Sequence, residues 1–313
     1  MLGYVARRLA LAIGTVFAAV LITFLLVHVG EGSPGAVKAG PGATPEQIDA
    51  ENEELGWNQP LFVQFGQLLG QLLRFDLGES LINGRDIAAD MADRLPVTAS
   101  IALTATLASG VVGILLGVLA AVRRGGVAKT VNTGAGIALS LPAFWVAILF
   151  VYLFSIELGL FPATGYVPFS EDPAAWFNSL VLPVLTLTVG GAAIIARTAY
   201  VGMREALGQE HIRTLRAVGT PEWRIRYLHA LRFASVPVVS VLGIQFIALF
   251  GGSVFVETVF AMAGLGQSAQ SAALSHDFPV LIAVVVVATV VVVVTNLLLD
   301  LLIAALDPKV RTS

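Results

Sequence analysis

The 313-residue chain lacks cysteine entirely and carries little charge of either sign. Without cysteine there is neither a disulfide framework nor a thiolate metal site. Asp, Glu, Lys and Arg make up 12% of the residues, against about 25% in an average soluble domain. Apolar residues make up 57%, and the mean hydropathy is +0.85. So few polar side chains cannot cover the surface of a soluble protein this long, and the composition therefore predicts a membrane protein.

Signatures of catalysis and of cofactor binding are also missing. The sequence has no Gly-x-x-x-x-Gly-Lys-Ser/Thr phosphate loop and no Gly-x-Ser-x-Gly elbow for a nucleophilic serine. None of the four histidines has another three or four residues away, the spacing at which a helix presents a metal pair. Residues 264–269 match a dinucleotide-binding Gly-x-Gly-x-x-Ala pattern, but no strand–helix–strand unit surrounds them. We therefore expect no catalytic residue, metal site or cofactor in this chain.

Long apolar runs dominate what is present. Each reaches about twenty residues or more, enough to cross a hydrocarbon core about 30 Å thick. The runs lack the alternation of barrel strands, and backbone groups in lipid must pair internally, so helices are predicted. The first run is 21 residues long, beyond the roughly 7–15 of a signal-peptide core, and we expect it to stay uncleaved. The sequence predicts an all-α integral membrane protein with six transmembrane helices, over residues 9–29, 97–122, 132–158, 180–201, 236–260 and 279–306.

Basic residues are distributed unevenly between the two sides that six spans define. The N-terminus, residues 123–131, residues 202–235 and the tail hold 13 Lys and Arg but only 4 acidic residues. The opposite side holds 4 Lys and Arg and 15 acidic residues, if Glu157 at the end of its span is included. Because basic loops stay in the cytoplasm, both termini are expected there. The chain then divides into a first helix (1–30), an extracytoplasmic segment (31–96), a five-helix core (97–306) and a cytoplasmic tail (307–313).

The extracytoplasmic segment is expected to contain helices. Residues 44–46, Thr-Pro-Glu, have the form of a cap followed by proline at the first helical position. Between residues 61 and 73, apolar residues recur at helical spacing on the side opposite three glutamines, Gln64, Gln67 and Gln71. This pattern predicts an amphipathic helix that lies either on the membrane surface or against the transmembrane helices.

Charged residues inside spans are costly in lipid and are candidates for function. Arg197 lies near the cytoplasmic end of its span, from which its side chain can reach the interface. Glu257 lies near the outer end of another span, one helical turn after Ser253. This pair either lines an outward-facing cavity or caps the membrane interface.

Two other pairs point to contacts between helices. Asp300 follows Asn296 by four residues, so both lie on one helix face, which is expected to point into protein. Gly113 and Gly117 form a Gly-x-x-x-Gly pair, which is typical of closely packed membrane helices.

The cytoplasmic loop over residues 202–235 is long for a compact helical membrane protein. Gly219 can terminate one helix, and Thr220 can cap the next, with Pro221 at its first position. The loop is thus predicted to fold as helix, tight turn and helix, with Arg213 and Arg216 in its first helix. Such a loop is suited to docking a soluble partner; alternatively, it forms a basic surface against anionic lipid headgroups.

At this loop the sequence resembles the membrane subunits of binding-protein-dependent ABC importers. Residues 213–219 read Arg-Thr-Leu-Arg-Ala-Val-Gly, close to the Arg-Thr-Ala-Arg-Ala-x-Gly at the coupling helix of the dipeptide and oligopeptide branch. The wider family's Glu-Ala-Ala…Gly signature is matched only at Gly219. Further blocks that resemble this branch follow in the same order, over residues 1–9, 55–65, 75–80, 94–98, 140–145, 159–166, 250–260 and 307–311.

The long segment after the first helix resembles the "B" permease of the pair rather than the "C" permease. Two blocks depart from the family's pattern. Its Pro-Gly-Asp-Pro after the first helix is Gly-Ser-Pro-Gly at residues 32–35, and its Pro-Gly-Leu-Gly after the fifth is Ala-Gly-Leu-Gly at residues 263–266. Both lie on the side that would face the binding protein, so the identity of the ligand stays open.

The resemblance implies a type I importer permease in a bacterial inner membrane. A homologous second permease would complete the pore, and two ATPase subunits, separate or fused, would bind ATP and Mg. A substrate-binding protein would deliver di- or oligopeptides, and no nucleic acid is involved. The implied coupling residues are Arg213, Thr214, Leu215, Arg216, Ala217 and Gly219. The candidate pathway residues of this chain are Gln245, Ser253 and Glu257.

An ion-coupled secondary transporter is the alternative function. It predicts paired acidic residues and discontinuous helices near the middle of the bilayer. Few acids lie in the spans, and none forms an evident pair with Arg197. Within the importer family, nickel chelates, glutathione or haem-like compounds are alternative ligands.

Overall fold

The structure is a computed structural model that describes the backbone of residues 2–30, 32–123 and 125–306. Side chains are described for residue 8 and within residues 10–30, 32–123 and 125–299. The predicted cytoplasmic tail (307–313) and the side chain of Asp300 therefore lie outside the described residues. The chain forms two compact units, one of Met1–Thr98 and Ala263–Val294, the other of Ala99–Met262 and Thr295–Ser313.

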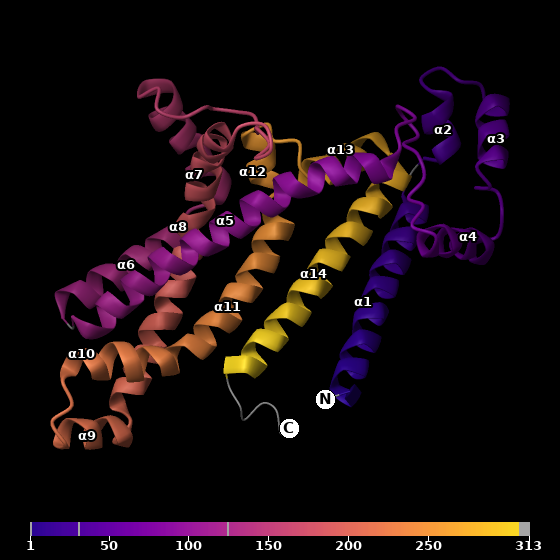
Figure 1. The fold of residues 1–313 in the computed structure, drawn as a ribbon. Helices are drawn as coiled ribbons and strands as arrows, with labels where there is room; N and C mark the ends of the chain where they lie inside the picture. Colours follow the sequence, from indigo (N-terminus) through magenta and orange to yellow (C-terminus); the bar gives the residue numbers. More distant parts are fainter. Residues whose placement is uncertain (1, 31, 124, 307–313) are drawn as a thin grey trace. The chain divides into compact units, whose positions relative to one another are not determined.

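Helices make up most of the described chain (Figure 1). They are, in order, α1 (Leu2–Val29), α2 (Pro34–Ala39), α3 (Pro45–Glu54), α4 (Leu61–Leu73), α5 (Ile87–Val122), α6 (Gly126–Ser140), α7 (Ala143–Phe150), the π-helix η1 (Val151–Glu157), α8 (Pro173–Gly208), α9 (Glu210–Ala217), α10 (Glu222–Arg224), the π-helix η2 (Ile225–Ala230), α11 (Leu231–Gly252), α12 (Val254–Val259), α13 (Leu265–Ser275) and α14 (Phe278–Leu306).

Five helices are long and apolar enough to cross a membrane, and a sixth span results if one bent pair is counted as a single crossing. This pair, α6 and the continuous α7–η1, corrects the straight helix predicted over residues 132–158, because the two parts meet at 97°. Pro142 is the cause: it has no N–H to donate to the carbonyl four residues earlier. Leu141, before the proline, is accordingly extended, with ψ of 124°.

The predicted loops are also shorter than expected. α6 begins at Gly126, inside the loop predicted at 123–131, and α13 occupies most of the one predicted at 261–278. α5 and α8 each extend to 36 residues, beyond the apolar runs that predicted them. The length of an apolar run gives only the part of a helix that lipid must surround. The helix itself continues for as long as its backbone hydrogen bonds continue.

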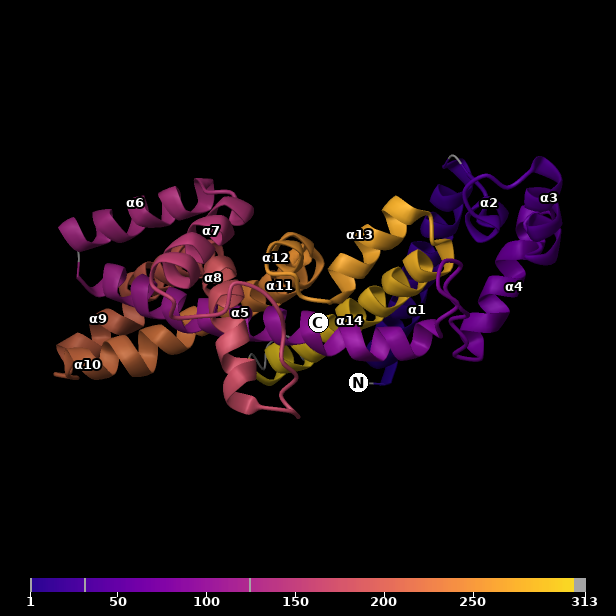
Figure 2. The same ribbon diagram turned by 90° about the horizontal axis from the view of Figure 1, so that it is seen from above.

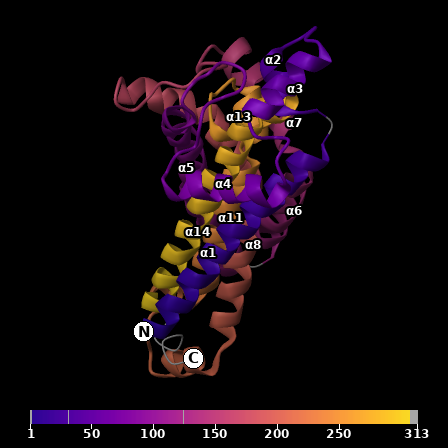
Figure 3. The ribbon, with the colours of Figure 1, turned by 90° about the vertical axis from the view of Figure 1, so that its right-hand side faces the viewer.

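In the first unit, α2 and α3 pack against each other (Figure 3). Gly35 N donates a 2.9 Å hydrogen bond to Asn52 Oδ1, and a Cβ on Gly35 would lie only 2.5 Å from that oxygen. Lys38 Nζ lies 2.7 Å from Glu51 Oε2, which is the main reason that the pKa of Lys38 is raised. The predicted cap of α3 is confirmed, with Thr44 and Gln47 forming a reciprocal capping box.

The predicted amphipathic helix is confirmed as α4, and it lies against α1 (Figures 1 and 3). The ring of Phe65 meets Phe17 and Phe24 of α1 at centroid distances of 5.7 and 5.2 Å. Two other apolar side chains, Phe62 and Leu73, are exposed. α4 therefore packs on a transmembrane helix with one apolar edge and leaves another uncovered within this chain.

In the second unit, α8 contacts α6, α7 and α11 (Figure 2). α5 also packs closely on α8, because both glycines of the predicted pair lie at their contact. A Cβ on Gly117 would lie 2.5 Å from Ala196 O, and one on Gly113 would lie 2.8 Å from Ala192 O. Neither helix could approach so closely with a larger residue at these positions, which confirms the packing role predicted for this pair.

Candidate functional site

The loop predicted to dock onto a partner is the tip of a helical hairpin. α8 ends at Gly208, α9 follows, and the chain returns through α10 and η2 into α11 (Figure 1). α9 ends at Ala217, and two residues later Gly219 has a φ of +80°, in the left-handed region that favours glycine. Gly219 N donates to Arg216 O at 3.1 Å, and Thr220 N donates to Leu215 O at 2.9 Å. These are the two bonds of a Schellman motif, so the prediction that Gly219 ends the first helix is confirmed.

The predicted start of the second helix is wrong by one position. α10 begins at Glu222, and Pro221 precedes it as the cap residue with an extended ψ of 140°. No side chain caps this helix, so Thr220 does not have the predicted role. The Schellman motif uses the backbone of Thr220 to close α9 instead.

Most of the predicted coupling residues are exposed on α9. Arg213, Thr214, Arg216, Ala217 and Gly219 face solvent, and Leu215 is half-buried. Their neighbour Ile212 is fully buried and holds α9 against the rest of the hairpin. The basic side chains are thus presented outward from a helix whose opposite side is fixed.

The two arginines of α9 differ in their surroundings. Arg216 Nε lies 2.7 Å from Glu222 Oε1, across the turn, and Arg226 Nε lies 3.3 Å from the other oxygen of the same carboxylate. Arg213 forms no ion pair among the residues that the structure describes. Arg216 therefore helps to hold the turn, whereas Arg213 is available to a partner.

Apolar and aromatic side chains next to these arginines were missed by the sequence reasoning. Val218 is 72% exposed, and Trp223 and Tyr227 are also more than half exposed. The guanidinium of Arg224 lies 5.3 Å from the centre of the Trp223 ring. Tryptophan and arginine side by side are typical of the residues that carry binding energy at protein interfaces. The sequence feature that could have revealed them is the cluster of aromatic and basic residues over 223–227.

The hairpin is connected directly to the membrane helices. Where the hairpin joins these helices, small and apolar side chains of four elements form one buried cluster. Its members are Val118 and Ala121 of α5, Met203 and Ala206 of α8, Ala230 of η2, and Ala234 of α11. Gly202 allows the close approach, since a Cβ there would lie 3.2 Å from Ala234 Cβ. The ends of α8 and α11 that flank the loop are therefore closely packed on each other and on α5.

Two of the predicted pathway residues form a buried pair. Ser253 Oγ donates a 2.7 Å hydrogen bond to Glu257 Oε1, and both residues have no exposed surface within this chain. The Glu257 carbonyl also accepts from Met262 N at 2.8 Å, where the chain turns after α12. The pair thus lines no open surface in the described conformation.

The third predicted pathway residue, Gln245, lines a cavity of about 200 Å³ in the second unit. Thr186, Gly190 and Gly191 of α8 form one wall, and residues around the bend between α6 and α7 form another, including Leu139 and Leu141. Gln245 lies on α11 and is 8% exposed. The structure therefore places Gln245, one of the predicted pathway residues, beside the break between α6 and α7.

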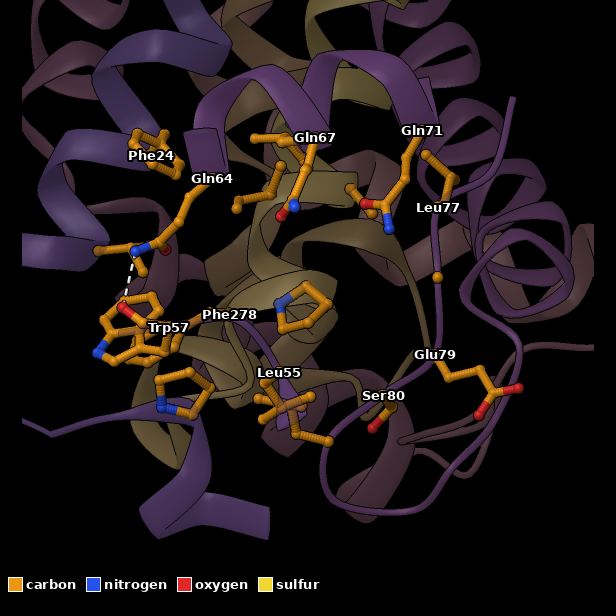
Figure 4. A pocket seen from close by; sticks show the side chains of 18 of the residues that line it. Phe24, Leu55, Trp57, Gln64, Gln67, Gln71, Leu77, Glu79, Ser80 and Phe278 are labelled. Carbon is orange, nitrogen blue, oxygen red and sulfur yellow. Dashed lines mark hydrogen bonds between the residues drawn. The ribbon is translucent and has the colours of Figure 1, made fainter. Parts of the chain in front are cut away.

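A larger cavity, of about 520 Å³, lies in the first unit. Figure 4 shows Gln64, Gln67 and Gln71 extending into it from α4, with Trp57, Phe278 and Leu55 around it. Gln64 Nε2 donates a 2.7 Å hydrogen bond to Trp57 O, and the His28 ring stacks on Trp57 at 4.0 Å. The glutamine side of the amphipathic pattern therefore faces a cavity inside the unit, which the sequence reasoning did not predict.

Residues 80–81, beside this cavity, are held to the residue that precedes α14. Ser80 Oγ donates to Asp277 Oδ2 at 2.5 Å, and Leu81 N donates to Asp277 Oδ1 at 3.2 Å. Asp277 is 4% exposed, and its carboxylate accepts both of these hydrogen bonds. Across the described ranges, no three His, Asp or Glu residues are grouped so that they could hold a metal ion.

The sequence blocks and the helical hairpin have a counterpart in a known family. Residues 113–312 match the family described as "Binding-protein-dependent transport system inner membrane component", and residues 1–102 match the corresponding N-terminal domain. The chain belongs to this family. It is accordingly a multi-pass membrane permease component, and the family resemblance deduced from the sequence is confirmed.

Curated relatives of this permease match it along nearly the whole length. A Brucella abortus protein described as a peptide transport system permease is 40% identical over 312 residues, covering 99% of both chains. A peptide ABC transporter permease of Sinorhizobium fredii is 36% identical, covering 98% of this permease and 99% of the relative. The glutathione transport system permease protein GsiC of Escherichia coli K12 is 33% identical, covering 99% of both.

The fold of the permease is also found in a solved transporter. A chain of the inward-facing MetNI methionine ABC transporter superposes with a TM-score of 0.58, covering 69% of this permease and 96% of that chain. The sequence identity is 23%, so this likeness bears on the fold alone. It supports the predicted all-α permease architecture.

Proposed function

We propose that this permease is a channel-forming subunit of an ATP-driven importer that takes up di- or oligopeptides. The observation that carries the proposal is the 40% identity, over 99% of both chains, to a protein described as a peptide transport system permease. The glutathione permease is a more distant relative, and glutathione is itself a small peptide. Peptides are therefore the ligand class that these relatives have in common.

The partners follow from the family. A homologous second permease completes the pore, a substrate-binding protein delivers the ligand, and two ATPase subunits, separate or fused, bind ATP and Mg. Arg213 to Gly219 dock in a cleft of an ATPase, with the basic charge of α9 directed to acidic groups on its rim. The exposed Val218 and Trp223 supply apolar contact area beside these charges.

The orientation follows from the charges and the docking loop. With the basic segments in the cytoplasm, α9 and both termini lie on the side where ATP is available, and residues 31–96 lie outside. The inner membrane of a bacterium is the compartment that fits this arrangement. The alternative, a basic surface against anionic headgroups, is tested by reversing the charges of Arg213 and Arg216.

The pathway is proposed to pass Gln245, Ser253 and Glu257. Ser253 and Glu257 are buried in the described conformation. They can line the pore only in a state in which α12 has moved, as would be expected when the pore opens outward.

Uptake in proteoliposomes tests the proposed function. The permease is co-expressed with its ATPase, binding-protein and second-permease partners, purified as a complex, and supplied with labelled di- and oligopeptides. Uptake that requires both ATP and the binding protein is expected. Uptake driven by a proton or sodium gradient without ATP would instead indicate the secondary transporter, and exclusive uptake of a nickel chelate or a haem-like compound would contradict the peptide assignment.

A further inference from the structure

Gln245 is a polar side chain with an unusual position among the membrane helices. It lies within α11, in a helix with the composition of a membrane span, and is 8% exposed. Its carboxamide has two donor hydrogens and an acceptor oxygen. Among the described residues none forms a hydrogen bond to this carboxamide. Gln245 lines a cavity, so its carboxamide can hydrogen-bond a partner that enters this cavity from outside the chain.

The neighbouring polar group on α5 does not satisfy Gln245. Ser109 Oγ is fully buried and has no hydrogen-bond partner within the described chain. A Cβ on Gly191 would collide with Ser109 Oγ and lie 3.0 Å from Gln245 Nε2. The missing side chain of Gly191 therefore opens a gap that both groups border, yet they do not bond to each other. This excludes the simplest structural explanation, a direct polar contact that fastens α5 to α11.

Another wall of the cavity contains irregular backbone. Ala138, Leu139 and Leu141 line the cavity at the break between α6 and α7. The carbonyl of Ala138 cannot receive its helical bond, since residue 142 is a proline. Irregular backbone is tolerated within a membrane only where it is buried in protein or lines a polar cavity. The break and Gln245 therefore border the same cavity.

The size of the cavity limits what it can hold. Its volume of about 200 Å³ is below the 300–1,000 Å³ that is usual for a whole small ligand. The lining side chains are apolar except for the carboxamide of Gln245 and the hydroxyl of Thr186, which already donates to Leu182 O at 2.8 Å, and none of them is charged. A neutral group that both donates and accepts a hydrogen bond matches this set. The peptide unit is such a group, with one N–H and one C=O.

We propose that Gln245 hydrogen-bonds the main-chain amide of a peptide as it passes through the permease, and that Gly190 and Gly191 keep the space open for it. The inference rests on the proposed peptide import and names the residue that reads the peptide bond. Contact with the main chain is independent of the peptide's side chains. Gln245 thus makes the pathway selective for peptides as a class, while the binding protein selects among them.

The test compares a peptide with its analogue methylated at the peptide nitrogen, which lacks the N–H donor. Uptake of both is measured for the complete complex with wild-type permease and with Gln245→Met, which keeps the length of the side chain but has no carboxamide. Any preference of the binding protein for one of the two compounds is the same with both permeases, so it cancels when their uptake ratios are compared. The ratio of peptide uptake to analogue uptake should fall about three- to tenfold in Gln245→Met, the change expected for one hydrogen bond.

Two further variants separate this role from a structural one. Gly190→Leu should fill the cavity and reduce uptake, because a Cβ on Gly190 would meet no atom within 4 Å and the helix can accept it. Gly134→Leu, on α6, also has free space but does not line the cavity, and should leave uptake unchanged. Ser240→Ala on α11 is the polar control, since Ser240 Oγ donates to Val236 O at 3.1 Å.

The outcomes distinguish the inference from the proposed function. An unchanged uptake ratio in Gln245→Met, or loss of the second permease from that complex, overturns the inference and leaves peptide import standing. A wild-type complex that imports no peptide contradicts the proposed function, and the inference falls with it. A lowered ratio together with reduced uptake by Gly190→Leu supports both.

Discussion

Arg216 and Glu222 are joined by an ion pair that closes the turn between α9 and α10, with 2.7 Å between Arg216 Nε and Glu222 Oε1. Both side chains are more than 40% exposed, so the pair itself contributes no more than about 1 kcal/mol. One of the two arginines predicted to contact the ATPase thus already has a partner within the loop. Arg213 lies one turn earlier on α9 and is free of this constraint.

Reversing the charge of both arginines should uncouple the permease from its ATPases. In Arg213→Glu/Arg216→Glu, attraction to acidic groups becomes repulsion, and each lost contact is worth about 1.5–3 kcal/mol. Peptide uptake and stimulated ATPase activity should fall at least tenfold, while insertion and pairing with the second permease stay normal. Arg74→Glu, which changes an exposed arginine outside the loop, is the control. Normal uptake and normal ATPase retention in the double variant would show that the loop is a lipid-facing surface.

A charge swap separates the two arginines. Arg216→Glu alone breaks the pair with Glu222, and adding Glu222→Arg restores a pair of opposite orientation. Uptake lost in the first variant should recover in part in the second, because the new pair holds the turn although the basic charge at position 216 is gone. Arg213→Glu has no partner to exchange and should stay defective. If the swap remains as defective as Arg216→Glu alone, Arg216 contacts the ATPase directly.

Gly219→Val should impair coupling through the backbone. Valine resists the left-handed conformation at φ +80°, which costs about 1–2 kcal/mol, so α9 would lose its Schellman ending. Uptake and ATPase co-purification should fall, although the thermal stability of the membrane helices should not change. Gly219→Asn is the matched variant, since asparagine adopts this conformation more readily, and it should keep more uptake. Equal losses in both would assign the effect to the side chain rather than to φ.

Gly117→Val should destabilise the packing of α5 on α8. The added side chain begins 2.5 Å from Ala196 O and 2.7 Å from Ala199 Cβ, and backbone cannot move aside as a flexible side chain can. Overpacking of this kind costs about 1–3 kcal/mol, so the melting temperature of the purified complex should fall. Gly136→Val on α6, where a Cβ meets nothing within 4 Å, is the control. Equal melting temperatures for all three proteins would show that the two helices do not pack this closely.

Reporter fusions should place Gly40 and Gly126 on opposite sides of the membrane. Gly40 follows α2 and Gly126 begins α6, so both sites lie at helix ends where an insertion interrupts no helix. A periplasmic reporter should be active at Gly40 and a cytoplasmic one at Gly126. Signals from the same side at both positions would contradict the orientation and, with it, the cytoplasmic position of α9.

Cysteine at position 253 should reveal movement of α12. The natural chain has no cysteine, so Ser253→Cys introduces the only thiol. Because Ser253 has no exposed surface in this conformation, a water-soluble thiol reagent should react slowly in the resting complex and faster in the ATP-trapped state. Equal inertness in every state would remove Ser253 and Glu257 from the pathway.

Local features were predictable because they depend on residues that are consecutive in the sequence. Apolar runs located the membrane helices, the Thr44 cap located the start of α3, and the glycine at 219 located the end of α9. Each depends on contacts within a few residues or on the solvent that surrounds a helix. The ends of α5 and α8 were missed for the same reason, since a helix can continue beyond the run that lipid requires.

Relationships between distant residues were decided by the tertiary structure. Nothing in the order of residues indicated that Glu222 would take Arg216 as its partner, that Ser80 would bond to Asp277, or that the glutamines of α4 would face a cavity. Pro142 was visible in the sequence, but whether it kinks a helix or turns it by 97° depends on what packs on each side. Composition and periodicity determine which surfaces a chain must bury. Only packing decides which buried groups lie next to each other, as it does for Gln245 and the break between α6 and α7.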